Sequence, residues 1–283
     1  MGKKNQIVEP EYYVSATNMP TLNYRVYKMK TPEKVIFFML AFVVGALVGY
    51  LFYGGIGKNE FGEPTTLTWV LNITIPAIVG SIAGYLYIPM RIKSNIEKRR
   101  KELSHQFRDM LDSLTTSLGT GKNVNDSFMS VYEDLKVQYD SDAYILKELE
   151  VIISGIHNNI AIEDMLEDFG RRSDNDDILS FANVFKISYR KGGNIKDIIR
   201  NTHEILSDKM EISEDIETLV TSNKMEQNIM IVMPIALIGV IKMMSPEFAA
   251  NFVTPTGIIS TTVSIVIFVV AYFIGKSVLN IKI

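Results

Sequence analysis

The chain has 283 residues, with 29 basic and 32 acidic side chains and a formal net charge of −3. Its mean hydropathy is +0.13 although 22% of the residues are charged, which disfavours a single soluble globule with evenly spread charges. No basic excess argues for nucleic acid as a partner. The absence of Cys excludes disulfides, thiolate metal sites and thiol nucleophiles.

Four windows hold most of the apolar excess. They are residues 35–53, 67–88, 229–244 and 258–275. A bilayer core of about 30 Å requires about 20 helical residues, so the first, second and fourth windows predict transmembrane helices. The third also qualifies if it begins near Gln227 and if Lys242 snorkels to the interface. The predicted organisation is an N-terminal arm (1–34), two spans (35–90), a middle domain (91–226) and two further spans (227–283).

Basic residues near the ends of the spans predict the orientation. Lys and Arg cluster before the first span and after the second, and Lys276 and Lys282 follow the fourth. The connections 54–66 and 245–256 contain one basic residue between them, Lys58. We therefore expect a multi-pass protein of the inner (cytoplasmic) membrane, with the arm, the middle domain and both termini in the cytoplasm.

Small residues recur four apart in the first two spans. They form Gly45-x-x-x-Gly49 and Gly80-x-x-x-Gly84. Such spacing lets two helix backbones approach closely within a membrane. The pattern predicts helix packing between the first and second spans.

The middle segment, 91–226, has 19 basic and 26 acidic residues, and its apolar residues recur at helical spacing. Leu103, Phe107, Met110, Leu114 and Leu118 illustrate the period. Similar runs predict about six helices, the last of which starts at Asn194 and continues toward the third span. The expected fold class is all-α: four transmembrane helices with a central cytoplasmic helical bundle, N-in and C-in.

Two turns of this segment are similar. Gly121-Lys-Asn-Val-Asn-Asp126 matches Gly192-Gly-Asn-Ile-Lys-Asp197 at an offset of 71 residues. In each, Asn can cap a helix and the Asp three residues later can face the free N–H groups. The match indicates either residues that commonly end one helix and begin the next or a duplicated three-helix unit. Candidate partner-binding or hinge residues are Gly119, Gly121, Asn123, Asp126, Gly192, Gly193, Asn194 and Asp197.

No pattern in the sequence predicts catalysis. His105, His157 and His203 are far apart, and no phosphate-binding loop or nucleophile elbow is present. The acidic runs at 163–168 and 174–177 are interpreted as solvated helix faces. Asn72, Thr74 and Lys242 provide too few polar groups for a transport path. We expect no enzyme activity, no catalytic residue, no cofactor and no metal.

Several segments carry a resemblance to a known family. The segments are Phe107-Arg-Asp-Met-Leu-Asp-Ser-Leu-Thr-Thr-Ser-Leu-Gly119, Gly121-Lys-Asn-Val-Asn-Asp-Ser-Phe128, Lys191-Gly-Gly-Asn-Ile-Lys-Asp-Ile-Ile199, Met233-Pro234 and Thr254-Pro-Thr-Gly257. Over about residues 95–280 the chain resembles the type II secretion system F-domain family, and within it the Tad/Flp pilus assembly platform proteins (TadB/TadC-like).

The resemblance implies a non-catalytic platform of a type IV (Tad/Flp-like) pilus or a type II-like secretion machine. Its implied partners are a hexameric cytoplasmic secretion or pilus ATPase, pilin subunits, the lipid bilayer, and a second copy or sister platform protein. The single helical domain departs from two-domain platform proteins, and the arm has no assigned counterpart. The alternative is a four-span membrane sensor or transporter accessory whose helical domain binds a soluble partner.

Overall fold

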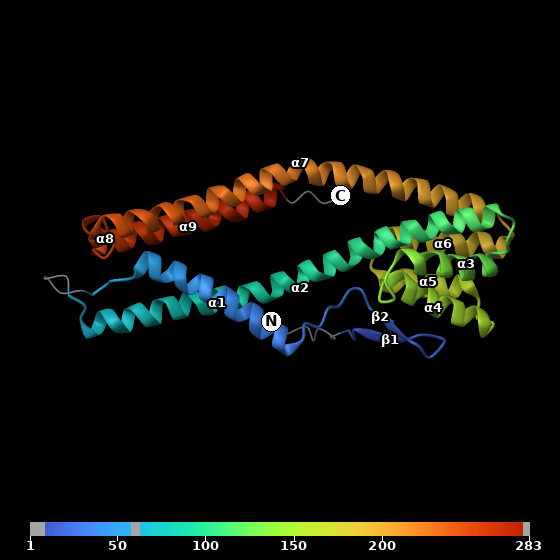
Figure 1. Cartoon of the computed structure of the whole chain (residues 1–283), viewed down its shortest axis with the longest axis horizontal. Helices are drawn as coiled ribbons and strands as arrows, with labels where there is room; N and C mark the ends of the chain where they lie inside the picture. The colour runs from blue at the N-terminus through green and yellow to red at the C-terminus, as the bar shows by residue number, and fades with distance from the viewer. Residues whose placement is uncertain (1–8, 58–62, 280–283) are drawn as a thin grey trace, which may run out of the picture. The chain divides into compact units, whose positions relative to one another are not determined.

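The computed structural model describes residues 9–57 and 63–279 (Figure 1). Within these residues it contains nine helices and one two-stranded hairpin, so the all-helical prediction is confirmed outside the arm. The elements are β1 (Tyr12–Val14), β2 (Pro20–Leu22), α1 (Thr31–Tyr53), α2 (Thr66–Gly119), α3 (Val124–Gln138), α4 (Tyr144–His157), α5 (Ile162–Ser173), α6 (Asp176–Lys191), α7 (Ile195–Met244), α8 (Pro246–Asn251) and α9 (Pro255–Leu279).

The chain divides into two compact units. Of the described residues, 9–28 and 92–211 form the helical unit, and 29–57, 63–91 and 212–279 form the span unit. This grouping differs from the consecutive segments expected from the sequence, because the arm packs into the helical unit. The helices α2 and α7 each contribute residues to both units.

The helical unit is built from the second part of α2, the whole of α3 to α6, and the first part of α7. Its core is formed by the side chains that the helical period selected, since Leu103, Phe107, Leu114, Phe128 and Phe185 are all fully buried. Edge-on ring contacts reinforce this core: the centroid of Phe107 lies 5.4 Å from that of Phe181. Such pairs add to the stability gained from burial of area alone.

The arm forms an antiparallel hairpin, which the sequence analysis did not expect. β1 pairs with β2 in the register Tyr12↔Leu22 and Val14↔Pro20. After the hairpin, Tyr24 enters the core of the helical unit with 1% of its surface exposed. Its ring meets that of Tyr144 edge-on at 5.7 Å. The arm is therefore an integral part of the helical unit.

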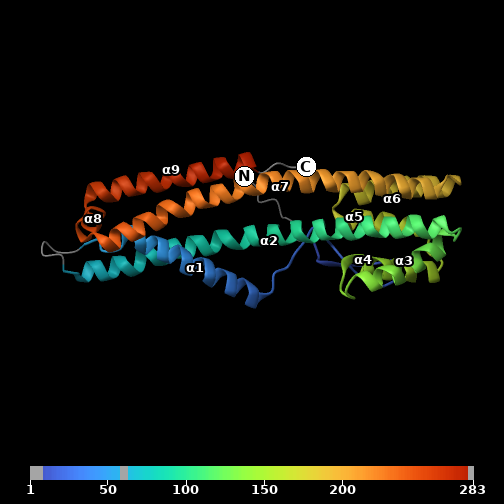
Figure 2. The ribbon, with the colours of Figure 1, turned by 45° about the horizontal axis from the view of Figure 1, so that its top comes forward.

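Four helices are long and apolar enough to cross a membrane: α1, α2, α7 and α9. The prediction of four membrane-spanning segments is confirmed at this level. Figure 2 and Figure 1 both show α1 alongside the first part of α2. A Cβ atom on Gly45 would lie 2.8 Å from Cβ of Ala83, and one on Gly80 would lie 2.7 Å from the carbonyl oxygen of Phe42. The backbones of the two helices touch where these glycines lie.

Gly49 and Gly84 lie at the same contact between α1 and α2. A Cβ atom on Gly49 would approach Cα of Pro76 to 3.2 Å, and one on Gly84 would approach the Phe38 ring to 2.6 Å. Because glycine has no side chain, the two helices approach closely enough for van der Waals contact. Such contact is a main source of attraction between helices surrounded by lipid.

Candidate functional site

The two similar turns adopt a left-handed backbone that favours glycine. Gly121 has φ of +89° and Gly192 has φ of +72°. No heavy atom lies within 4 Å of where a Cβ atom on either residue would be. Glycine is therefore favoured at these two positions by the backbone conformation and not by close packing. The space beside each turn is open.

Asparagine and aspartate hold each turn in the way that the sequence predicted. Oδ1 of Asn123 accepts a hydrogen bond of 2.8 Å from the backbone N–H of Asp126, and its amide donates to the Asp126 carboxylate at 2.7 Å. In the second turn the Asn194 amide donates to the Asp197 carboxylate, and Oδ1 of Asn194 lies 3.4 Å from the Asp197 backbone nitrogen. These contacts satisfy free N–H groups at the start of a helix. They make both turns preformed.

The glycines that flank the two turns have different surroundings. Gly119 ends α2 and is exposed. Gly193 is also exposed, but a Cβ atom there would lie 3.2 Å from Cβ of Ser188.

Three connections lie at one end of the helical unit, which we call the turn end (residues 119–123, 158–161 and 191–194). A Cβ atom on Gly119 would lie 4.0 Å from Nζ of Lys196, which joins the first connection to the third. Nε of Arg190 lies 3.1 Å from a carboxylate oxygen of Glu163, which joins the third to the second. The turn end thus gathers both candidate turns on one surface.

A buried polar cluster ties the arm to the helices. The guanidinium of Arg172 donates to both carboxylate oxygens of Glu148, at 2.9 and 2.7 Å, and these side chains are 6% and 4% exposed. The Tyr24 hydroxyl donates to Oε1 of Glu148 at 3.0 Å. Arg172 also donates to the carbonyl oxygen of Leu22 at 3.0 Å and to Asp168 at 2.7 Å.

The electrostatics of this cluster follow from its burial. Burial raises the pKa of Tyr24 well above its ordinary value, and the adjacent Glu148 carboxylate raises it further. Burial opposes the charge on Arg172, but the hydrogen bonds and negative charges of Glu148 and Asp168 together outweigh this effect and raise its pKa. Arg172 and Glu148 therefore form a buried bidentate contact with a structural role. Sequence reasoning missed it, because single Glu and Arg residues on helices are typical of solvated faces.

The sequence analysis interpreted the acidic run on α5 as a solvated face, and this is only partly right, because Asp164 and Asp168 are exposed but Glu163 and Glu167 are not. Glu163 is 7% exposed and pairs with Arg190. Lys186 of α6 donates to Asp164 at 2.8 Å and to Glu167 at 2.5 Å. The contacts with Lys186 lower the pKa of both carboxyl groups. The run forms ion pairs between α5 and α6, which a one-dimensional charge pattern does not show.

Two polar residues of the spans complete the end of α1. If α1 continued, the backbone N–H of Gly55 would donate to the carbonyl oxygen of Leu51. It donates instead to Oδ1 of Asn72 at 2.8 Å. The Leu51 carbonyl instead accepts from Nζ of Lys242 at 2.7 Å. Thr74 donates to the carbonyl of Val70 in its own helix. The three polar groups weighed as a transport path thus satisfy backbone groups.

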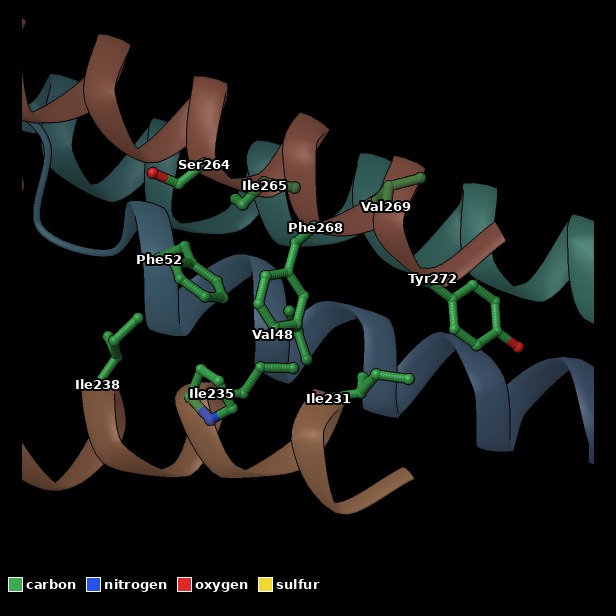
Figure 3. A pocket seen from close by; sticks show the side chains of 11 residues that line it. Val48, Phe52, Ile231, Ile235, Ile238, Ser264, Ile265, Phe268, Val269 and Tyr272 are labelled. Atoms are coloured by element: carbon green, nitrogen blue, oxygen red, sulfur yellow. The ribbon is translucent and has the colours of Figure 1, made fainter. Parts of the chain in front are cut away.

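A groove of about 360 Å³ lies within the span unit. Figure 3 shows Phe52, Val48 and Phe268 projecting into it, and the hydroxyl of Tyr272 pointing away. Its lining comes from α1, α7 and α9 and includes no charged side chain. An apolar groove of this kind suits a hydrocarbon chain.

Among the described residues, no three His, Cys, Asp or Glu side chains gather in a way that could hold a metal ion. Comparisons with family models, with curated proteins and with solved structures found no match to this chain. The functional argument therefore rests on the residues themselves.

Proposed function

We propose that the chain is a non-catalytic platform protein of the inner (cytoplasmic) membrane that couples a cytoplasmic hexameric ATPase to pilin assembly in a Tad/Flp-like pilus or related secretion machine. One observation carries the proposal. A single compact helical unit, most of which lies in the sequence between two pairs of candidate membrane-spanning helices, presents three exposed connections together at its turn end. The resemblance of these turns to those of the F-domain family supplies the class of machine.

The turn end has the properties of a docking surface for a soluble partner. Both candidate turns are capped by their own Asn and Asp side chains, so a partner would meet a preformed shape and little ordering entropy would be lost. Lys122, Asn123, Lys191 and Asn194 are exposed there. A preformed, exposed surface of this kind can dock a partner without any catalytic group.

Exchanging charge at the turns tests this role. In cells, we expect Lys122→Glu with Lys191→Glu to reduce pilus assembly or secretion strongly without lowering the amount of protein in the membrane. The matched control is Lys147→Glu with Lys224→Glu, which makes the same charge change on exposed positions of α4 and α7. Normal assembly by the turn variant, or equal loss in the control, would exclude the turns as the docking surface.

The proposed orientation places the helical unit in the cytoplasm. Since the native chain has no Cys, single cysteines report sidedness without background. A Ser141→Cys variant should resist an impermeant thiol reagent added to intact cells, and an Asn251→Cys variant, in the connection between α7 and α9, should react. Labelling of Ser141→Cys from outside would reverse the orientation.

A further inference from the structure

A second hollow lies on the helical unit, between α3 and α4. This groove has a volume of about 500 Å³. Its lining is Met129, Tyr132 and Glu133 from α3 with Glu150, Ile153, Ser154 and His157 from α4. Because His157 ends α4 immediately before the connection 158–161, one end of the groove opens at the turn end.

The groove combines apolar side chains with two carboxylates that form no ion pair in the part of the chain that the structure describes. Within the described chain, neither Glu133 nor Glu150 has a cationic side chain within ion-pair distance. The acidic residues of α5, by contrast, are ion-paired. The Tyr132 hydroxyl donates to Oε1 of Glu150 at 2.9 Å. This bond orients the Glu150 carboxylate and leaves its second oxygen available.

The chemistry of the lining selects a cation with an apolar stem. A guanidinium can bond a carboxylate through two parallel N–H groups and can stack on an aromatic face. Its methylene stem can cover apolar side chains while its charge stays near water. Here Met129 and Ile153 supply the apolar contact, and Tyr132 supplies the ring. Nζ of Lys136 lies 5.6 Å from the centroid of the same ring, within the range of a cation–π contact.

We propose that the groove between α3 and α4 binds an arginine side chain presented by a helix of a soluble protein partner, with Glu133 and Glu150 as its carboxylate ligands. The inference deepens the proposed function and rests on it in one respect, the existence of a soluble partner. It adds the place of contact beside the turn end and the charge of the contacting segment.

A peptide probe tests the groove without the natural partner. The probe is a capped alanine-based helical peptide with one Arg and one Leu four residues later, and its matched control carries citrulline in place of Arg. Binding to the full-length protein in lipid nanodiscs is measured by fluorescence anisotropy. We expect saturable binding of the Arg peptide and weaker binding of the citrulline peptide.

The variant Glu133→Gln with Glu150→Gln should weaken binding of the Arg peptide about tenfold or more, because two charge-assisted contacts are lost. The variant keeps an acceptor for the Tyr132 hydroxyl, so the fold is preserved. The control, Glu204→Gln with Glu211→Gln, removes the same net charge from exposed positions of α7 and should bind as the native protein does.

Three outcomes would overturn the proposal: no saturable binding to the native protein, equal binding of the citrulline peptide, or equal weakening in both variants. The last would indicate a diffuse charge effect. The probe is not the ATPase, so its failure to bind would contradict the groove proposal and leave the proposed function unchanged. Conversely, a protein that binds the peptide but not the ATPase would contradict the proposed function and leave the groove proposal unchanged.

Discussion

The hydroxyl of Tyr24 donates a hydrogen bond of 3.0 Å to the carboxylate of Glu148, 124 residues further along the chain. Both side chains are buried, so the arm and α4 share one core. We expect Tyr24→Phe to lower the free energy of unfolding by about 2 kcal/mol, since the lost hydrogen bond has a charged acceptor. Tyr24→Ala should cost about 3–5 kcal/mol, because it also leaves a cavity.

Thermal or denaturant unfolding of the full-length protein in detergent measures these losses. Tyr12→Phe is the matched control, since Tyr12 is 59% exposed on the same arm. Unchanged stability of Tyr24→Ala would mean that the arm does not dock.

The ion pair of Arg172 with Glu148 predicts strongly non-additive mutations. Arg172→Met leaves a buried carboxylate without its counter-ion and should destabilise by about 3–5 kcal/mol. Adding Glu148→Leu removes that stranded charge, so the double variant should be more stable than Arg172→Met alone. A double-mutant cycle from unfolding curves checks this prediction. Additive losses would show that the two groups are not coupled.

The stability that the ion pairs between α5 and α6 contribute should depend on pH. The ordinary pKa of Asp164 is 3.8 and that of Glu167 is 4.5, and hydrogen bonds from Lys186 lower both. Their contribution to stability is therefore fully present above these ordinary values and is lost as the pH falls through the lowered pKa values of the folded state. Lys186→Met should flatten this part of the stability profile. An identical acid profile in that variant would contradict the account.

These residues also show how far the sequence alone reaches. Apolar runs and helical spacing predicted the helices, the apolar span segments and the buried positions of Leu103, Phe107 and Leu114, because burial of one face repeats along a helix. The same reasoning missed the hairpin, Tyr24, and the pairing of Glu148 with Arg172. Those contacts join segments that are distant in sequence, and a single buried polar residue leaves no period. The roles of Gly121 and Asn123 could be predicted from the sequence, because the conformation of a turn and the capping of a helix depend on neighbouring residues.

The glycine contact between α1 and α2 predicts a position-specific cost. Gly80→Ala should destabilise by about 1–3 kcal/mol, because its Cβ would press on a backbone oxygen of Phe42. Gly239→Ala is the control, since its Cβ would meet only the Leu51 side chain, at 3.5 Å from Cδ1 and 3.9 Å from Cδ2, which are ordinary van der Waals distances. Thermal unfolding in detergent compares the two. Equal effects would show that the first two spans do not pack through these glycines.

Binding of the full-length protein in lipid nanodiscs to the secretion ATPase of the same organism, with ATP and with ADP, tests the central claim most directly. The account predicts saturable binding that depends on the nucleotide and that Lys122→Glu with Lys191→Glu weakens. The whole chain is required, because a fragment of residues 91–226 would lack Tyr24 and expose the Glu148–Arg172 pair. Absence of binding in both nucleotide states by demonstrably folded protein would contradict the platform function.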